Sequence, residues 1–599
     1  MLFPFHVQLF IRFIISFVMW SLLTPGHVKA LQAGGMEQNS STWSNPPGSV
    51  VGDSFTPSTV QITWWMEDRF GVDADQDGII DVPNTFEYAN VKDVACPSDP
   101  REKRKCEEAP PKFVVYFDST GSHLQDRSFY PPENITITEY YWTIQGPGGV
   151  KNYTTPKFGV RLEQGKYTVQ LTVGGKNTVG KNISDTKVES LTIKDIVFVA
   201  LGDSFASGEG NPEQRKLSLV EIFRLSQSNS GDINLDEMTS AHWAETGPKW
   251  NPTISKNRDH ARAHRSTLSW PAQVALTLER SDPHTSVTFI FLAATGATIR
   301  EGLLGPHQGA LEEVSGFLKP QLQETQEILG GRPVDILTMS IGGNDVGFSS
   351  LITALLKTVG TDRQLARREK AIKTGEWDEI LEVFWWTGGK DVNADGLDRL
   401  PSLFDKLAEK INSIFQPQHT YILGYPDLTQ YRVDGRILTC DHIGDDVLKV
   451  RFNKKIDDEE AAWAREHFIL PLNQVIRHAA SRHGWRYVED RDQWITPRGY
   501  CGRPLYSIEE YTGHQFIASG LFPLSRRLFD SFVNRDESHS FRWWRTAKES
   551  HPIQGVEPSE DRGITPDTIE TRGMFHPNEM GHQALMHLMI QAMPEWFQR

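Results

Sequence analysis

The chain has 599 residues, of which 38% are hydrophobic and 10% aromatic, so it is long enough for more than one domain with a packed core. Its formal net charge of −15 argues against a general nucleic-acid binder, because contacts to phosphates need a basic surface. The same charge gives no reason to expect attraction to an anionic membrane surface.

The N-terminus predicts a secretory signal peptide over residues 1–30. Few charges precede an apolar segment at about 9–23, and VKA at 28–30 is typical of a cleavage site. The alternative is a membrane anchor, but the apolar segment is short for a spanning helix. We therefore expect a protein that is secreted, or exported to the periplasm or cell surface, with no stable membrane span.

A flexible lead-in rich in Ser, Gly, Asn and Pro is expected over 31–60, followed by short strands with alternating polarity over 61–195. The clearest of these strands are 113–117, 136–144 and 166–173. Turn residues separate them, which predicts a small β-sandwich domain. The YW pair at 141–142, with GKYTV at 165–169, resembles a PKD or immunoglobulin-like module.

Alternating carboxylates early in this region resemble the first half of a calcium loop. Asp73, Asp75 and Asp77 can converge on one cation, and Asp81 can supply a further ligand. Asn84 stands where an EF-hand has a bidentate Glu, so a standard EF-hand is not expected. Two interpretations stay open, a structural Ca²⁺ loop and an acidic surface turn.

Four cysteines in an exported chain suggest two disulfides. Cys96 and Cys106 flank a short charged loop, and Cys440 and Cys501 both lie in the C-terminal part. We expect the pairs Cys96–Cys106 and Cys440–Cys501, although spacing alone does not fix the connectivity.

An unbroken apolar run over 196–200 predicts a strand that is buried on both faces. It leads into a turn of small residues that contains Ser204. The carboxyl end of a parallel strand is the usual place for a site in an α/β fold. Ser204 is therefore a candidate nucleophile, and the alternative is an ordinary strand-to-loop turn.

Later strands end in the same way. The apolar run 287–292 is followed by Gly296, and the run 336–340 is followed by Asn344. Further strands are expected at 420–424 and 486–488, a helix at 472–483, and a last helix that begins with Asn578 as its cap. Strands that alternate with helices predict a parallel sheet covered on both sides. Two stretches, near 355–417 and 507–571, look like insertions that could form a lid or a substrate wall.

Four blocks occur in this order: GDS at 202–204, ATGAT at 294–298, GGND at 342–345 and HPN at 576–578. Together they resemble the GDSL or SGNH hydrolase family. The resemblance covers 196–599 and implies an α/β domain with a three-layer parallel sheet.

The resemblance also implies roles for single residues. Ser204 would be the nucleophile and His576 the catalytic base, since a serine hydroxyl needs a base to remove its proton. The oxyanion hole would consist of the backbone N–H groups of Ser204 and Gly296 and the side-chain amide of Asn344. No cofactor is implied for catalysis.

This chain departs from the family pattern at the third triad position. The family places an aspartate three residues before the histidine, where this chain has Gly573. We predict a Ser–His dyad in which the carbonyl of Gly573 or Met574 accepts the histidine N–H. The rival is an acid from elsewhere in the chain, and the nearest in sequence are Asp561, Asp567 and Glu570.

The resemblance points to one further difference and leaves one rival for the base. Secreted family members often carry a disulfide at positions that here match Ala263 and Ala294, so that bridge is absent as a unit. His582, inside the last helix, is the competing candidate for the base.

The leading hypothesis is an exported serine esterase or lipase that acts on carboxylic esters of lipids or acylated carbohydrates. The alternatives are a polysaccharide O-acetyl esterase, and a non-catalytic surface adhesion or binding protein with a decayed hydrolase fold. The sequence contains no G-x-S-x-G elbow, phosphate loop or H-E-x-x-H zinc motif.

Overall fold

The computed structural model describes residues 58–68, 71–72, 82–83, 112–211, 262–309, 317–357, 361–377, 394–433, 436–440, 443, 456–490, 495, 498–502, 542–545 and 573–597. The predicted signal peptide, the lead-in up to 57, the candidate calcium ligands Asp73, Asp75, Asp77 and Asp81, and the pair Cys96–Cys106 lie outside these residues. They remain predictions.

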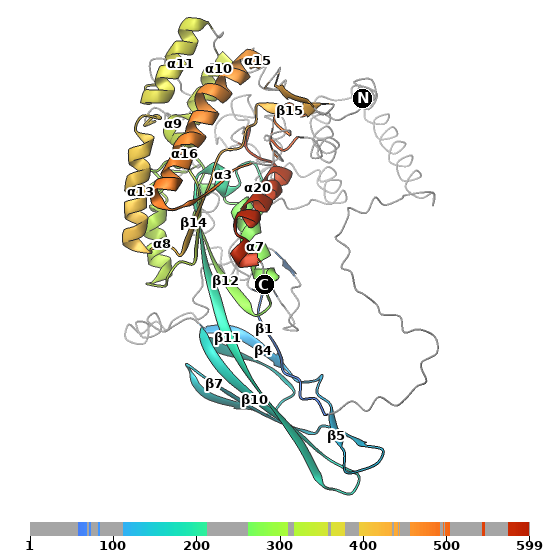
Figure 1. Ribbon diagram of the computed structural model, residues 1–599. Coiled ribbons are helices and arrows are strands. Elements are labelled where there is room, and N and C mark those ends of the chain that lie inside the picture. Colours follow the sequence, from blue (N-terminus) through green and yellow to red (C-terminus); the bar gives the residue numbers. More distant parts are fainter. Residues whose placement is uncertain are drawn as a thin grey trace, which may run out of the picture. The chain divides into compact units, whose positions relative to one another are not determined.

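Two antiparallel sheets share one apolar core in the region predicted to be a β-sandwich (Figure 1). One sheet has the order β1 (Thr63–Met66), β4 (Lys112–Asp118), β9 (Lys157–Glu163). The other runs β8 (Gly149–Tyr153), β7 (Glu139–Gly146), β10 (Gly165–Lys176) and β11 (Asn182–Gly202). Alternate side chains such as Trp142 and Val169 are buried, as the period of two requires. The PKD or immunoglobulin-like assignment stays a prediction.

Strand β11 belongs to this region and to the parallel sheet. Its residues 182–193 pair antiparallel with β10, and from Lys194 onward it pairs in parallel with β12 (Thr285–Phe291). Its last residues also pair with β13 (Ile336–Ser340). The exposure of the side chains alternates in the first part of the strand, and every residue from Asp195 onward is buried. The predicted domain boundary at 195/196 therefore falls inside one continuous strand, where one face of the sheet stops being solvated.

The parallel strands have the order β17 (Arg486–Val488), β14 (His419–Leu423), β13, β11, β12. Helices lie on both sides of them in Figure 1. One group contains α7 (Trp270–Ser281) and α20 (Glu579–Ala592), which contact each other, and the other contains α8 (Gln321–Leu329), α13 (Leu400–Ile414) and α16 (Leu470–His483). Asn578 caps α20, as predicted, and Gly484 ends α16 in the left-handed conformation.

The remaining described elements are short pairs or flanking helices. They are β2 (Gly71–Val72) with β3 (Val82–Pro83), β5 (Leu124–Asp126) with β6 (Glu133–Ile135), β15 (Gln430–Val433) with β16 (Arg436–Thr439), α3 (Ser204–Ser207), α9 (Gly343–Val346), α10 (Phe348–Lys357), α11 (Asp362–Thr374), α15 (Asp458–Ala464), the π-helical turn η2 (Arg465–Ile469) and α21 (Pro594–Phe597). No helix within the described ranges is both long and apolar enough to cross a membrane.

The stretch 355–417, which the sequence suggested to be an insertion, is in part a standard connection. Its end forms α13, whose buried side chains, among them Phe404 and Leu407, belong to the main core. The next element is β14, so α13 is the crossover helix between β13 and β14 that a parallel pair requires. The buried side chains of α13 recur with the helical period. The helix was not predicted because the polar residues before it made the whole stretch look like an insertion.

Cys440 and Cys501 form a disulfide, with their Cα atoms 5.4 Å apart, as predicted. Both residues are buried in the main core. They lie 61 positions apart in the sequence.

Replacing both cysteines by alanine is expected to lower the free energy of unfolding by about 4 kcal/mol, because the bridge closes a long loop in the unfolded chain. Denaturant unfolding of the oxidised protein and of the double variant measures this difference. A reductant should destabilise the original protein more than the variant, in which only the expected pair Cys96–Cys106 is left to reduce. Equal unfolding midpoints for the two oxidised proteins would contradict the prediction.

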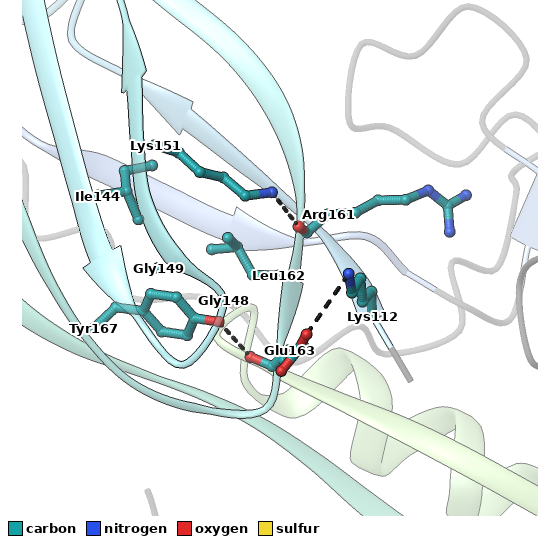
Figure 2. A pocket seen from close by; sticks show the side chains of 9 residues that line it. All are labelled: Lys112, Ile144, Gly148, Gly149, Lys151, Arg161, Leu162, Glu163 and Tyr167. Atoms are coloured by element: carbon teal, nitrogen blue, oxygen red, sulfur yellow. Dashed lines mark hydrogen bonds and ion pairs between the residues drawn. The ribbon is translucent and has the colours of Figure 1, made fainter. Parts of the chain in front are cut away.

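A hollow in the antiparallel region is lined by residues of β4, β7, β8, β9 and β10 (Figure 2). Its polar groups pair with one another: Lys112 Nζ lies 3.6 Å from a Glu163 carboxylate oxygen, and Lys151 donates to the carbonyl of Arg161. The Tyr167 hydroxyl donates to the Glu163 carbonyl at 2.9 Å. Since these groups interact within the protein, we assign no ligand to the hollow.

Candidate active site

The turn after β11 fixes Ser204 at the first position of α3. Gly202 has φ +137, and a Cβ there would lie 2.2 Å from the Ser340 carbonyl oxygen, so this position requires glycine. Asp203 caps the turn by accepting the Phe205 N–H. Gln321 holds Gly202 from the side, accepting its N–H and donating to its carbonyl, each at 2.8 Å.

His576 lies beside this serine. Its Nε2 is 2.7 Å from Ser204 Oγ, and its Nδ1 is 3.1 Å from the Met574 carbonyl oxygen. A carbonyl can only accept, so Nδ1 carries the hydrogen and Nε2 of the neutral ring accepts the Ser204 hydroxyl. The geometry therefore brings Ser204, His576 and the carbonyl of Met574 together. Asp561, Asp567 and Glu570 lie outside the described residues.

Burial governs the charge of the His576 ring. Loss of solvent lowers its pKa, against the opposing effects of the Glu209 carboxylate and the carbonyls of Met574 and Gly573. A lowered pKa keeps the ring neutral at neutral pH, which is the form that can accept a proton.

Two backbone N–H groups lie in the turns that follow β11 and β12. The N–H groups of Ser204 and Gly296 donate no hydrogen bond within the part of the chain that the structure describes. Asn344 Nδ2 donates to the Ala297 carbonyl at 3.0 Å, which leaves its second hydrogen available. These are the three donors that the sequence suggested for an oxyanion.

His307 sets the direction of one of these donors, a role the sequence did not reveal. Its Nε2 donates to the Thr295 carbonyl at 2.8 Å. In a trans peptide the C=O and the following N–H point in opposite directions, so this bond fixes where the Gly296 N–H points. The left-handed backbone of Gly296, with φ +72, completes the turn.

Tyr425 connects the two strand ends that carry Ser204 and Asn344. Its hydroxyl donates to the Asp203 carboxylate and accepts the Gly343 N–H at 2.8 Å. Burial raises the pKa of Asp203 to about 7, although the bonds from Tyr425 and Phe205 oppose the shift. The tyrosine therefore sets the relative position of the nucleophile turn and the Asn344 turn.

Tyr425→Phe is expected to lower the free energy of unfolding by about 1–3 kcal/mol, because it leaves the buried Gly343 N–H without its acceptor. We also expect kcat to fall by roughly tenfold as Asn344 loses its fixed position. Tyr421→Phe is the matched control: Tyr421 lies on β14 and donates to Glu595, so only stability should change. An unchanged kcat in Tyr425→Phe would contradict a positioning role for the hydroxyl.

Arg545, inside the predicted insertion 507–571, connects the serine loop to the histidine loop. Its guanidinium donates to the Gly210 carbonyl at 3.0 Å and to Asn211 Oδ1 at 2.8 Å, and its backbone N–H donates to the His576 carbonyl. Asn211 in turn donates to the Pro577 carbonyl at 2.8 Å. This described piece of the insertion is part of the wall that holds His576.

The competing histidine lies elsewhere. His582 Nδ1 accepts the N–H of Trp270 at 3.2 Å, and burial lowers its pKa to about 3. His582 thus fastens α20 to α7. Ala263 and Ala294, the positions of the absent family bridge, share a small buried apolar cluster with Ala297 and Leu318. Within the described ranges, no group of three or more His, Cys, Asp or Glu residues could hold a metal ion.

No family model matches the chain, and no curated protein matches it. Among solved structures, the chain is similar to an extracellular lipase from Streptomyces rimosus, with 16% identity and a TM-score of 0.34 over 66% of this chain and 99% of that one. A phospholipase A1 from Streptomyces albidoflavus NA297 gives 15% identity and a TM-score of 0.31 over 67% and 98%. A putative arylesterase from Agrobacterium tumefaciens gives 11% and 0.22 over 51% and 89%. At these identities and TM-scores the similarities support no assignment of activity, which must come from the site itself.

Proposed function

We propose that the protein is an exported serine hydrolase that cleaves carboxylic esters through Ser204 and His576. The observation that carries the proposal is the 2.7 Å approach of His576 Nε2 to Ser204 Oγ. The N–H groups of Ser204 and Gly296, which donate to no described residue, support it as donors for an oxyanion. A hydroxyl, a neutral base and backbone donors at one strand edge are the groups that acyl transfer needs.

In the proposed reaction, Ser204 Oγ attacks the ester carbonyl carbon while its proton moves to His576 Nε2. The Met574 carbonyl keeps the ring oriented as it becomes charged. The oxyanion accepts hydrogen bonds from the Ser204 and Gly296 N–H groups and from Asn344. His576 then gives the proton to the departing alcohol. A water molecule, deprotonated by the same ring, attacks the acyl carbon, the bond to Ser204 Oγ breaks, and the ring returns the proton to Oγ.

Export is proposed on two grounds. The N-terminal segment has the features of a signal peptide. The Cys440–Cys501 disulfide suits an oxidising compartment.

A fluorophosphonate probe tests the proposal, because it labels only an activated serine. We expect stoichiometric labelling of the purified protein and a modified peptide that contains Ser204. No labelling of folded protein would favour the non-catalytic alternative. A series of p-nitrophenyl esters from acetyl to palmitoyl, with an acetylated polysaccharide, then separates an esterase or lipase from a polysaccharide O-acetyl esterase.

A further inference from the structure

A buried acid lies beside the proposed dyad and has no role in the mechanism above. Glu209 belongs to the loop that follows α3, where its backbone N–H donates to the Ser204 carbonyl at 3.2 Å, and its side chain is 0% exposed. One of its carboxylate oxygens lies 2.7 Å from His264 Nδ1. Removing a carboxylate from water costs several kcal/mol. Its position next to the site therefore calls for a functional explanation.

The partner of this acid is held in an uncommon backbone conformation. His264 has φ +49, a left-handed value that few residues other than glycine adopt. The next residue, Arg265, donates from its buried side chain to the carbonyls of Ala293 and Leu292. Strain of this kind persists where surrounding contacts enforce it, and it is often found at functional sites. Here it presents the imidazole to Glu209.

The acid is ionised and acts on the His576 ring. Burial alone would raise the pKa of Glu209, but His264, His576 and Thr295 outweigh burial and lower the pKa to about 2. Among the groups that raise the pKa of His576, the Glu209 carboxylate is the strongest, ahead of the carbonyls of Met574 and Gly573. A carbonyl dipole orients the ring, but it carries no net charge.

We propose that Glu209 supplies the negative charge that stabilises the His576 imidazolium, at a site where Gly573 occupies the position of the missing triad acid. His264 is the positioning residue that holds this carboxylate. The inference rests on the proposed function. No proton passes to Glu209: it moves from Ser204 to His576, and from His576 to the leaving alcohol.

Other ionisable groups surround the ring. His264 opposes Glu209, and burial, His576 and Arg545 together keep His582 neutral. Arg545 lies 3.7 Å from Glu579, and Asp203 stands at the start of α3. Among them, Glu209 is the carboxylate whose effect on His576 dominates.

The sign of the pH effect follows from these charges. The neutral ring is the active base, so kcat/KM rises with pH through the pKa of His576. Removing a nearby negative charge lowers that pKa, and the acidic limb of the profile must move to lower pH. A loss of packing alone would lower the plateau without moving the limb.

Glu209→Gln, which keeps the shape and removes the charge, is expected to move the limb down by about one pH unit and to lower kcat by roughly 10- to 100-fold. KM should change little, because the imidazolium exists only on the way to products. The double variant Glu209→Gln with His264→Gln, whose two amides can bond each other, is measured in parallel and should shift the limb in the same direction.

Glu279→Gln is the matched control. Glu279 is also a buried carboxylate, 4% exposed, and it accepts the Val287 N–H in the amino-terminal part of β12, away from the site. This variant should lose stability and keep the limb in place.

The outcomes separate the two proposals. If the fluorophosphonate probe does not label the original protein, the proposed function and this inference both fail. If the original protein is labelled but the limb stays in place in whichever Glu209 variant folds, the inference alone is overturned, even where kcat falls.

Discussion

Replacing Ser204 or His576 by alanine is expected to lower kcat for a short ester by about 10⁴-fold or more, with little change in stability. Each group is useless without the other: the serine keeps its proton without the ring, and the ring has no nucleophile to activate without the hydroxyl. The 2.7 Å contact between them motivates the prediction. Initial rates on p-nitrophenyl acetate, with unfolding midpoints to confirm the fold, provide the measurement.

The double variant sharpens the test. Since the two residues act as a unit, Ser204→Ala with His576→Ala should be no slower than the slower single variant. His582→Gln serves as the comparison for histidine loss, because His582 bonds to Trp270 and not to Ser204. It should lose stability and keep most of kcat. Two results would rule out the dyad. One is a double variant whose loss of kcat equals the product of the two single losses, and the other is a Ser204→Ala variant that retains a sizeable fraction of the activity.

Asn344→Ala is expected to lower kcat by about 10²–10³-fold with a small effect on KM, as for the loss of one oxyanion donor. The amide is fixed by its bond to the Ala297 carbonyl, and Asp345 beside it accepts the Ile299 N–H at 3.0 Å. These bonds hold the donor in place before the substrate arrives, so little energy is needed to orient it during the reaction.

Asn177→Ala is the control for loss of a buried amide. Asn177 lies in the turn between β10 and β11, and its side chain donates to Asp126 of β5 at 2.9 Å. The substitution should therefore reduce stability and leave kcat unchanged. If Asn344→Ala raised KM and left kcat unchanged, Asn344 would be a ground-state binding group instead of an oxyanion donor.

The candidate site was predictable where one short segment contains both the scaffold and the functional group. A buried apolar strand followed by a small-residue turn makes Ser204 a candidate, and the order of the four blocks implies the roles of Ser204 and Asn344 by resemblance. Because Gly573 occupies the position where the family has an acid, a backbone carbonyl was predicted as the partner of the histidine. The His576 ring contacts the carbonyl of Met574.

The supporting residues were not predictable, because each acts on a segment far away in the chain. Gln321, His307, Tyr425 and Arg545 sit in stretches with no recognisable motif. Each acts through one or two hydrogen bonds to backbone or to a carboxylate that the fold alone brings near. Glu209 stands between two glycines, which is an unusual place for an acid, but the neighbouring sequence does not indicate that its side chain is fully buried.

The hydrophobic pattern of the sequence predicted which strands exist better than it predicted where each strand begins. Strands at 336–340 and 486–488 were predicted with their observed bounds, because buried parallel strands have a distinct apolar pattern. Strand β11 was predicted only from Ile196 onward, since its earlier half alternates and resembles a separate antiparallel strand. Sequence patterns indicate a change of environment, and such a change does not require a break in the strand.

The continuity of β11 restricts how its length can change. Side chains of a strand alternate between two faces, so inserting or deleting one residue between Asn182 and Lys194 would turn every later side chain to the opposite face. The reversed stretch would include the residues that lead into Ser204, unless a bulge absorbed the change. Length changes of two residues would preserve the alternation. Segments engineered into this half of β11 should therefore change its length by an even number of residues. This holds although the changed positions pair only with the antiparallel sheet.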